Sequence, residues 1–554
     1  MKNAILQKKY SILTIVFLIL ISVPVVFPYF KLQAINTYDT LYRLTRAAKY
    51  YVAIKQGQVP PRWIGDTYHG VGEPIFVYLY PFPYMLTTIL HVLKFPFVTG
   101  LNILTILSVI GSSITMYIFL SRLFRPFASF VGAALLVWAP YRMVQLYVRG
   151  AFEETMTYLF LPLIFLSIWM INKKKRLAWV WGGIFLGILF LTQASVSLMF
   201  LPSIISLMAI LWLKNRSQHV FYQSIKMGLM GFGLSGLVSL PNILERHFIQ
   251  LDKNIAPIYE KNFIPFDRLI NSIWLMIPPP HMLGKAHLLV VVIAFFLIVF
   301  VIRKKEKDKT YKWLFFLSFA WSIIPILLAL DHPWVKFFWK NILVIRVIYV
   351  PYLFLQLATF WTSFLGAYIV DKLNKIGTLL GIVLLLVTIG TNFNYIKPDY
   401  YFSIMDFDLT GFNGPLSQFE EFLPKTAQKA DTLFNVGDIA LSTNKSSQIE
   451  VKEQKYHRIR LLVNAKDTDS IVIHQLFFPG WQAKINEKLT NISYTKPVVD
   501  SITGKPVSDA GLMLIRIPPG RNEVVLTFHQ TLIQIIGTIL SFASFLLAIF
   551  LLWL

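Results

Sequence analysis

The sequence predicts a polytopic α-helical membrane protein with about 12 membrane-spanning helices and a small β-sandwich-like domain outside the membrane. Apolar residues make up 56% of its 554 residues and charged residues only 14%, whereas soluble domains carry about 25% charged residues. Runs of roughly 20 apolar residues recur along most of the chain, and each is long enough to cross a bilayer. Near residue 393 these runs give way to shorter β-rich stretches, which predict the second domain.

Clusters of basic residues indicate how the chain is threaded through the membrane. The formal net charge is +24. Most Lys and Arg residues stand in short clusters between apolar runs, which is typical of cytoplasmic loops rather than of a nucleic-acid-binding surface. If these loops and the N-terminus are all cytoplasmic, an even number of crossings separates each successive pair. The clusters are SRLFR (121–125), NKKKR (172–176), KNRSQH (214–219), RKKEKDK (303–309) and DKLNK (371–375).

This parity predicts about 12 crossings of a cell membrane, with both termini in the cytoplasm. The apolar stretch 74–93 would break the parity if it crossed. It contains three prolines and many aromatic residues, so we expect a juxtamembrane helix on the outer surface. The first run follows Lys8 and Lys9 and is longer than a signal-peptide core, which predicts a retained helix. The expected crossings are 11–29, 99–120, 127–140, 155–171, 177–193, 197–213, 220–240, 286–302, 311–330, 342–369, 376–392 and 531–554.

The crossings divide the chain into a membrane core and an outer domain. Cytoplasmic loops are at most about ten residues long, and the chain has no Cys. A nucleotide-binding domain inside the cell and thiolate metal sites are therefore excluded, and we expect any chemistry on the outer side. In the outer domain, PPGRNE (518–523) predicts a hairpin turn between the last two strands. The expected parts are a core at 1–392 with outer loops 30–98, 141–154 and 241–285, an extracytoplasmic β-rich domain at 393–530 and a last membrane helix at 531–554.

Carboxylates and arginines gather in the predicted outer loops. Asp39 and Arg43 follow the first membrane helix, and the second loop carries Arg149, Glu153 and Glu154. A cleft with both kinds of group would suit an anionic, hydroxylated substrate. A plainer interpretation stays open, because first-turn acids complement a helix dipole and Arg43 could simply be the i,i+4 partner of Asp39.

Two further candidates stand apart from these motifs. His69 lies in the first outer loop, and Arg346 lies near the outer end of the last long helix before the β-rich domain. A histidine in a loop is often structural, and an arginine at an apolar boundary can snorkel to the interface without binding a substrate.

The order of the motifs resembles a known superfamily. The chain resembles the GT-C glycosyltransferases in the order of an outer acidic motif, GxxPPRW, GxGxPxFxY and an interfacial helix. It resembles more closely the YfhO-like bacterial membrane proteins and those named for a 6-pyruvoyl-tetrahydropterin-synthase-related domain. PYRMVQLYVRGAFEE (140–154) and PLSQFEEFLP (415–424) are similar to segments of that group, as are FFPGWQAKIN and IPPGRNEVVLTF in the β-rich region. The sequence departs from the group at Gln193, where a histidine is expected.

The resemblance implies an integral-membrane glycosyltransferase that moves a sugar from a polyprenyl-phosphate donor to an extracytoplasmic glycan, teichoic acid, lipid or protein. Under it, Asp39 is the general base of an inverting displacement. Arg149 and Arg346 are phosphate-binding candidates, with Arg43 and His69 also contacting substrate. Glu153 and Glu154 would position the acceptor or, together with Asp39, hold Mg²⁺ or Mn²⁺.

Two other functions remain open from the sequence alone. A transporter or flippase of lipid-linked saccharides could use the same cationic cleft, although such folds usually contain inverted repeats and the sequence shows no repeat. A non-catalytic scaffold could present the β-rich domain to a cell-envelope polymer.

Overall fold

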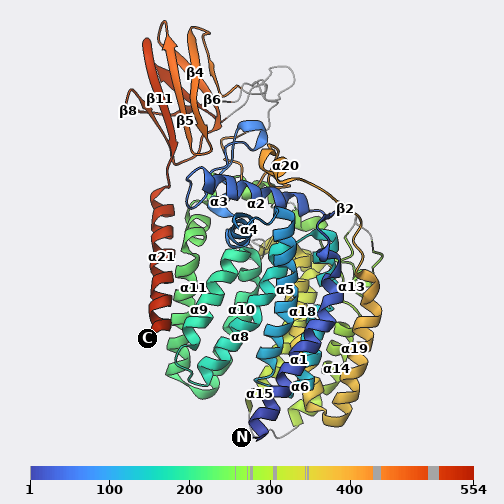
Figure 1. Cartoon of the computed structure of the whole chain (residues 1–554). Coiled ribbons are helices and arrows are strands. Elements are labelled where there is room, and N and C mark those ends of the chain that lie inside the picture. Colours follow the sequence, from blue (N-terminus) through green and yellow to red (C-terminus); the bar gives the residue numbers. More distant parts are fainter. Residues whose placement is uncertain are drawn as a thin grey trace.

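A bundle of long apolar helices forms the body of the protein in the computed structural model (Figure 1). At one end it carries several short helices and a β domain. The structure describes residues 2–255, 258–270, 272–274, 279–303, 309–342, 345, 348–427, 438–496 and 511–554.

Helices long and apolar enough to cross a membrane account for most of the bundle. Among the described residues there are ten, and two shorter apolar helices stand at two further predicted crossings. The chain is therefore a multi-pass membrane protein, as predicted. The ten are α1 (Lys2–Val26), α5 (Phe97–Leu120), α6 (Pro126–Val137) continued by α7 (Pro140–Val144) and a π-helix (Gln145–Arg149), α8 (Phe152–Asn172), α10 (Ala194–Asn215), α11 (Gln218–Leu244), α15 (Lys309–Ala329), α18 (Phe354–Lys372), α19 (Asn374–Asn392) and α21 (Leu532–Trp553); the shorter two are α9 (Ala178–Thr192) and α14 (Lys285–Arg303).

One predicted crossing begins too early. The apolar pattern predicted a helix from residue 342 to 369, but α18 begins at Phe354, after a 3₁₀ turn at Pro351–Leu353. Val350 is extended, with φ −133° and ψ 120°, because the ring of Pro351 disfavours helical geometry in the residue before it. Tyr349 and Val350, just before this turn, line a cavity.

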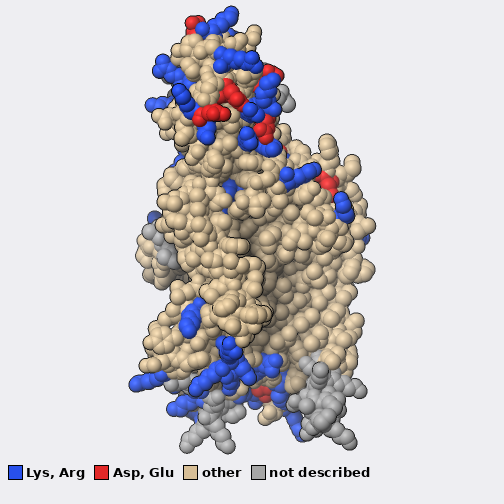
Figure 2. Space-filling view, turned by 60° about the vertical axis from the view of Figure 1, so that its left-hand side comes forward, with Lys and Arg blue, Asp and Glu red and all other residues tan. Residues whose placement is uncertain are grey.

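The loops that carry four of the five basic clusters lie together, whereas most of the fifth cluster, at 303–309, is outside the described residues. The turns after α5, α8, α10 and α18 are at the end of the bundle opposite the β domain, as are both termini (Figure 1). Figure 2 shows Lys and Arg side chains crowding that end, and few charges over the apolar middle. This arrangement agrees with the charge parity of the sequence.

Short helices cover the end of the bundle that faces the β domain. The stretch 74–93 forms α3 (Ile75–Tyr78) and α4 (Phe82–Val92). With 11 residues, α4 is about 16 Å long, which is too short to span a bilayer, so the prediction that this stretch does not cross is confirmed. The 16-residue helix α2 (Thr40–Lys55) lies across the same end of the bundle (Figure 1).

The β domain consists of two antiparallel sheets, as predicted for a sandwich. Its strands alternate buried and outward residues, as in β5, where Ile459, Leu461 and Val463 face the core. One sheet has the order β3 (Ala440–Ser442), β6 (Asp469–Leu476), β10 (Leu512–Ile517), β9 (Ser493–Tyr494); the other has the order β4 (Ser447–Lys455), β5 (Arg458–Ala465), β11 (Gly520–Phe528), β7 (Trp481–Ile485), β8 (Lys488–Thr490).

The predicted hairpin at PPGRNE is wrong. Strand β10 pairs with β6 and β9, whereas β11 pairs with β5 and β7. The two strands therefore belong to different sheets, and Pro518 and Pro519 carry the chain from one to the other. Two prolines, which have no N–H to donate, suit such a crossing better than a paired turn.

Residues between the bundle and the sheets lie on the helical core. The short strand β2 (Tyr401–Phe402) pairs with β1 (Ala34–Ile35), just before α2, and α20 (Asp406–Gly411) packs on α2. The strands of the two large sheets begin only at Ala440.

The first outer loop joins the core to the β domain. Trp63 is fully buried among the rings of Phe478, Trp481 and Phe528, at centroid distances of 6.2, 5.6 and 5.4 Å. Its indole N–H donates to Oε1 of Gln475 at 2.8 Å. The loop that contains PPRW thus fills one end of the β domain's core and fixes the domain above the bundle.

Candidate functional site

Two loops that are far apart in the sequence meet at the start of α2. The main-chain N–H of Asp39 donates to the carbonyl of Arg149 at 3.0 Å. Gly150 has φ +65°, and a Cβ there would overlap Oγ1 of Thr37, so only glycine allows this approach. Oγ1 of Thr37 also accepts from the N–H of Thr40 at 3.1 Å. These contacts place Asp39 beside the motif that precedes α8.

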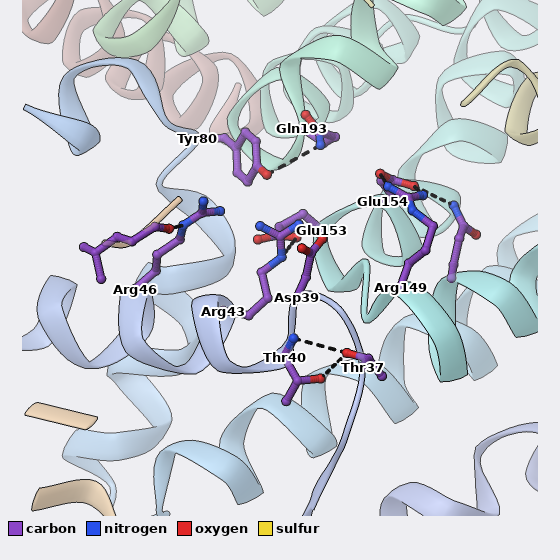
Figure 3. Close-up of polar contacts among 12 residues, drawn as sticks. Thr37, Asp39, Thr40, Arg43, Arg46, Tyr80, Arg149, Glu153, Glu154 and Gln193 are labelled. Atoms are coloured by element: carbon purple, nitrogen blue, oxygen red, sulfur yellow. Dashed lines mark hydrogen bonds and ion pairs between the residues drawn. The ribbon is translucent and has the colours of Figure 1, made fainter. Parts of the chain in front are cut away.

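Asp39, Arg43 and Glu153 form one ion-pair chain (Figure 3). Nη2 of Arg43 donates to Oδ2 of Asp39 at 3.0 Å, and its Nε lies 2.7 Å from Oε2 of Glu153. Tyr84 donates to the other oxygen of Glu153 at 2.5 Å. Burial by itself lowers the pKa of Arg43, but the two carboxylates outweigh it and hold that pKa well above its usual value. Arg43 is therefore a fixed cation whose charge is balanced.

Arg149 and Glu154 form a second, bidentate pair (Figure 3). The two guanidinium nitrogens of Arg149 donate to the two oxygens of Glu154 at 2.6 and 2.7 Å. Gln145 donates to the same carboxylate at 3.1 Å, and the guanidinium lies 4.8 Å from the ring centre of Tyr352. Glu153 and Glu154 stand in the first turn of α8, where the helix dipole also favours acids. Glu153 and Glu154 can therefore complement the dipole of α8 and bind the arginines of the site at the same time.

A cavity of about 390 Å³ opens between these groups and the loops above them. Of the predicted site residues, Asp39, Arg43, Arg149 and Glu154 line it, whereas Glu153 lies behind Arg43. Its volume falls in the range of small-ligand pockets. The other lining residues include many aromatic side chains: Tyr38, Tyr42, Tyr78, Tyr80, Tyr349, Tyr352, Phe419 and Phe422.

Arg46 lines the same cavity, and sequence reasoning gave it no role. It stands three residues after Arg43 and seven after Asp39 on α2, so all three side chains share one helix face. That spacing was a signal in the sequence that could have identified Arg46. Its Nε donates to the carbonyl of Leu416 at 2.7 Å, which ties α2 to the segment PLSQFEEFLP.

The segment PLSQFEEFLP closes one side of the cavity. Gln418, Phe419, Glu421 and Phe422 line it. Further along, the N–H of Gln250 donates to the carbonyl of Leu423 at 2.9 Å. The position of this segment over the cavity was not predictable from the sequence.

Gln193 also lines the cavity, at the turn between α9 and α10. Its Oε1 accepts from the N–H of Ser195 at 3.3 Å and caps α10, while its Nε2 lies 3.5 Å from the hydroxyl of Tyr80 (Figure 3). The residue that departs from the expected histidine therefore faces the candidate site.

Glu73 is buried just behind Arg46. Both carboxyl oxygens lack a hydrogen-bond partner among the described residues. Burial and the nearby Glu421 raise the pKa of Glu73 to about 8, although Arg46 opposes the shift. The carboxyl is therefore mostly neutral at pH 7.

Comparisons with known proteins do not assign the chain to a family. No protein-family model and no curated protein sequence matches the chain. Among solved structures, the cryo-EM structure of arabinofuranosyltransferase AftD from mycobacteria is similar, with a TM-score of 0.42 and 14% identity, over 71% of this chain and 27% of AftD. The chain thus spans about a quarter of AftD, and the function has to be argued from the site itself.

Of the two remaining predicted residues, one does not line the cavity and the other is not described by the structure. His69 is exposed and outside the residues that line the cavity, and its main-chain N–H donates to the carbonyl of Asn413 at 2.8 Å. Arg346 lies outside the described residues.

The predicted divalent-cation ligands do not fit a metal. Among the described residues, no group of three His, Asp or Glu side chains could hold one. Glu153 and Glu154 each hold an arginine instead, on separate sides of the first turn of α8 (Figure 3). No step below involves a metal ion.

Proposed function

We propose that this chain is an integral-membrane glycosyltransferase that moves a sugar from a polyprenyl-phosphate donor to an acceptor on the extracytoplasmic side. The observation that carries the proposal is the environment of Asp39. One of its oxygens is held by Arg43, its side chain is 21% exposed, and it lines a cavity that also contains arginines and aromatic rings. A carboxylate, cations and ring faces in one cavity match the hydroxyl, phosphate and sugar of such a reaction.

The sidedness follows from the positive loops. Basic clusters mark cytoplasmic loops, and they lie at the end of the bundle opposite the β domain. The cavity and the β domain are then extracytoplasmic. Nucleotide sugars are not available there, so a glycosyl donor has to arrive on a lipid. A lipid phosphate places its sugar at the membrane interface, the level at which α2 lies across the bundle.

The proposed reaction is a single inverting displacement. An acceptor hydroxyl binds at the free oxygen of Asp39, within about 2.6–3.2 Å, and gives up its proton to this carboxylate. The acceptor oxygen forms a bond to the anomeric carbon, while the bond from that carbon to the phosphate oxygen breaks. The bonding electrons leave with the phosphate, which is released as polyprenyl phosphate, and positive groups stabilise its growing charge.

The two ion pairs orient the reacting groups. Arg43 holds Oδ2 of Asp39, which leaves Oδ1 for the acceptor. Arg149 is engaged by Glu154 through both terminal nitrogens. We therefore assign Arg149 a positioning role, in which it fixes the loop whose main chain binds that of Asp39.

A turnover assay tests the proposal. The purified protein is given a panel of polyprenyl-phosphate sugars, and the release of polyprenyl phosphate is measured for wild type and Asp39→Asn. We expect at least one donor to turn over and the variant to be about 10²–10⁴-fold slower, the usual contribution of a general base. Asp267→Asn, at an exposed acid in the first turn of α13 (Phe266–Ile270), is the matched control.

Two results would count against this function. Full activity of Asp39→Asn would remove this carboxylate from the role of base. Absence of turnover with every donor, in a protein that is folded by its melting curve, would reject the glycosyltransferase proposal as a whole.

A further inference from the structure

Three arginines among the described residues line the cavity, and they differ in how their charge is balanced. Arg43 contacts the carboxylates of Asp39 and Glu153, and Arg149 is bound bidentately by Glu154. Within the described part of the chain, Arg46 has no carboxylate oxygen within 4.0 Å, although 95% of its surface is buried.

Arg46 keeps donors available to the cavity. Its Nε is used by the carbonyl of Leu416, while its two terminal nitrogens have no partner among the described residues. A buried cation that lacks a counter-charge is costly unless an anion reaches it. A guanidinium fork with two free nitrogens matches two oxygens of one phosphate group.

The charge of Arg46 is compensated only from a distance. Burial lowers its pKa, but Tyr84 and the carboxylate of Glu153 help to raise that pKa above its ordinary value without contacting the guanidinium, and the groups behind Arg46 add little negative charge at pH 7. Glu73, on the segment that leads into α3, is buried and largely neutral at pH 7. The other titratable groups that face Glu73 are Tyr68 on the first outer loop and Glu420 and Glu421 on the segment above the cavity. Burial raises the pKa of Tyr68 far above its usual range, so Tyr68 stays neutral.

The spacing along α2 suits an in-line displacement. Seven residues separate Asp39 from Arg46, which is about 10 Å along a helix axis. A base, an acceptor oxygen, an anomeric carbon and a phosphate in a row need a hydrogen bond of about 2.8 Å and an attack distance of about 3.2 Å. With the bonds to the leaving phosphate and one more hydrogen bond, the row is a few ångströms longer than this rise, a difference that the length of the arginine side chain can cover.

We propose that Arg46 forms a phosphate subsite of the cavity, which binds a single phosphate group opposite the carboxylate of Asp39. The phosphate could belong to the lipid donor or to a phosphate-containing acceptor. The subsite deepens the proposed function, because its position relative to the base rests on that function. Phosphate binding itself does not require any turnover.

Binding measurements on the full-length protein in nanodiscs test the subsite. One probe is a polyprenyl monophosphate, which represents the donor, and the other is glycerol phosphate, which represents a soluble phosphate ester. Arg46→Gln is expected to weaken binding of at least one probe about 10–100-fold, the usual effect of losing hydrogen bonds to a charged group. The affinity of Arg46→Lys should lie between those of wild type and Arg46→Gln, since lysine keeps the positive charge but does not have two nitrogens that can bind one phosphate together.

The control is Lys55→Gln, which removes an exposed cation from the last turn of the same helix. It should bind both probes within about twofold of wild type. Selective loss of the lipid probe in Arg46→Gln assigns the subsite to the donor, and selective loss of glycerol phosphate assigns it to the acceptor. Binding of both probes at wild-type affinity would overturn the proposal.

A pH series provides a second, independent test if Arg46→Gln is unstable. Between pH 7 and 9 Glu73 ionises and can pair with Arg46, while a phosphate monoester, with a second pKa of about 6, hardly changes charge. Binding of the lipid probe by wild type should therefore weaken over this range, and binding by Glu73→Gln should weaken less. Equal pH profiles for the two proteins would contradict the link between Glu73 and Arg46.

The subsite and the proposed function fail separately. Wild-type phosphate affinity in Arg46→Gln rejects the subsite even if sugars are transferred. Absence of transfer, together with loss of phosphate binding in Arg46→Gln, keeps the subsite and rejects the glycosyltransferase.

Discussion

Replacing Trp63 by Ala should loosen the β domain from the helical core. Trp63 belongs to the first outer loop, yet its ring is fully buried against Phe478, Trp481 and Phe528 of the β domain. Its N–H is the partner of a buried oxygen of Gln475. The substitution removes both the packing and this hydrogen bond at one point.

The size of the effect follows from these contacts. Truncating a buried Trp to Ala costs about 3–5 kcal/mol, and an oxygen left unpaired in the interior adds about 1–3 kcal/mol. The Nε2 of Gln475 keeps its bond to the carbonyl of Gly65 at 2.6 Å, so Oε1 is the atom that is left without its partner. The two costs sum to about 4–8 kcal/mol. Taking the low end, we expect the free energy of local opening to fall by at least about 4 kcal/mol, which is roughly 10³-fold in the opening equilibrium.

Hydrogen–deuterium exchange reports on this opening. The N–H of Leu476 donates to the carbonyl of Val71 at 2.7 Å, across the boundary between the two parts. In peptides that contain Leu476, β7 and the end of β11, the protection factor should fall by about 10³-fold. Trp63→Phe should have a smaller effect, because its aromatic ring preserves part of the packing. It still loses the hydrogen bond of the indole N–H.

The control is Trp334→Ala in α16 (Pro333–Asn341), whose side chain is exposed. Protection of the Leu476 peptide in Trp63→Ala within about threefold of wild type would refute the reasoning. So would an equal loss of protection in α18, since that would mean general unfolding instead of local undocking.

Three further predictions address the site. Glu154→Gln leaves a buried guanidinium without its counter-charge, so the melting temperature in detergent should drop in line with a loss of about 3–5 kcal/mol; an unchanged temperature would contradict the importance of this pair. Gly150→Ala forces an overlap with Thr37 and should slow polyprenyl-phosphate release at least about tenfold, because misplacement by 1 Å can cost 10²-fold. Gly57→Ala, where φ is also positive but no atom lies within 4 Å of the added Cβ, should leave turnover unchanged. For Glu73, the raised pKa of about 8 lies above its ordinary value, so stability present at pH 4.5 should fall as the pH rises towards 8. Melting curves of Glu73→Gln should lack this decline.

The sequence by itself determined the membrane architecture and one local piece of the site. Apolar length and the positions of Lys and Arg are local properties of the chain, and they predicted the crossings, the non-crossing stretch 74–93 and the β domain. The pair Asp39 and Arg43 was also predictable, because the i,i+4 spacing on a helix brings two side chains together whatever the rest of the fold does.

The tertiary structure decided which distant segments share the cavity. Glu153 reaches Arg43 across more than a hundred residues of sequence, and PLSQFEEFLP meets Arg46 from more than three hundred and fifty residues away. No local periodicity encodes such contacts, since they depend on how whole helices pack. The same limit explains the wrong hairpin at PPGRNE, because packing of the two sheets determined the strand partners. The helical spacing could have placed Arg46 beside Asp39 and Arg43, but only the structure showed that, among the described residues, its charge lacks the direct carboxylate contact that its neighbours have.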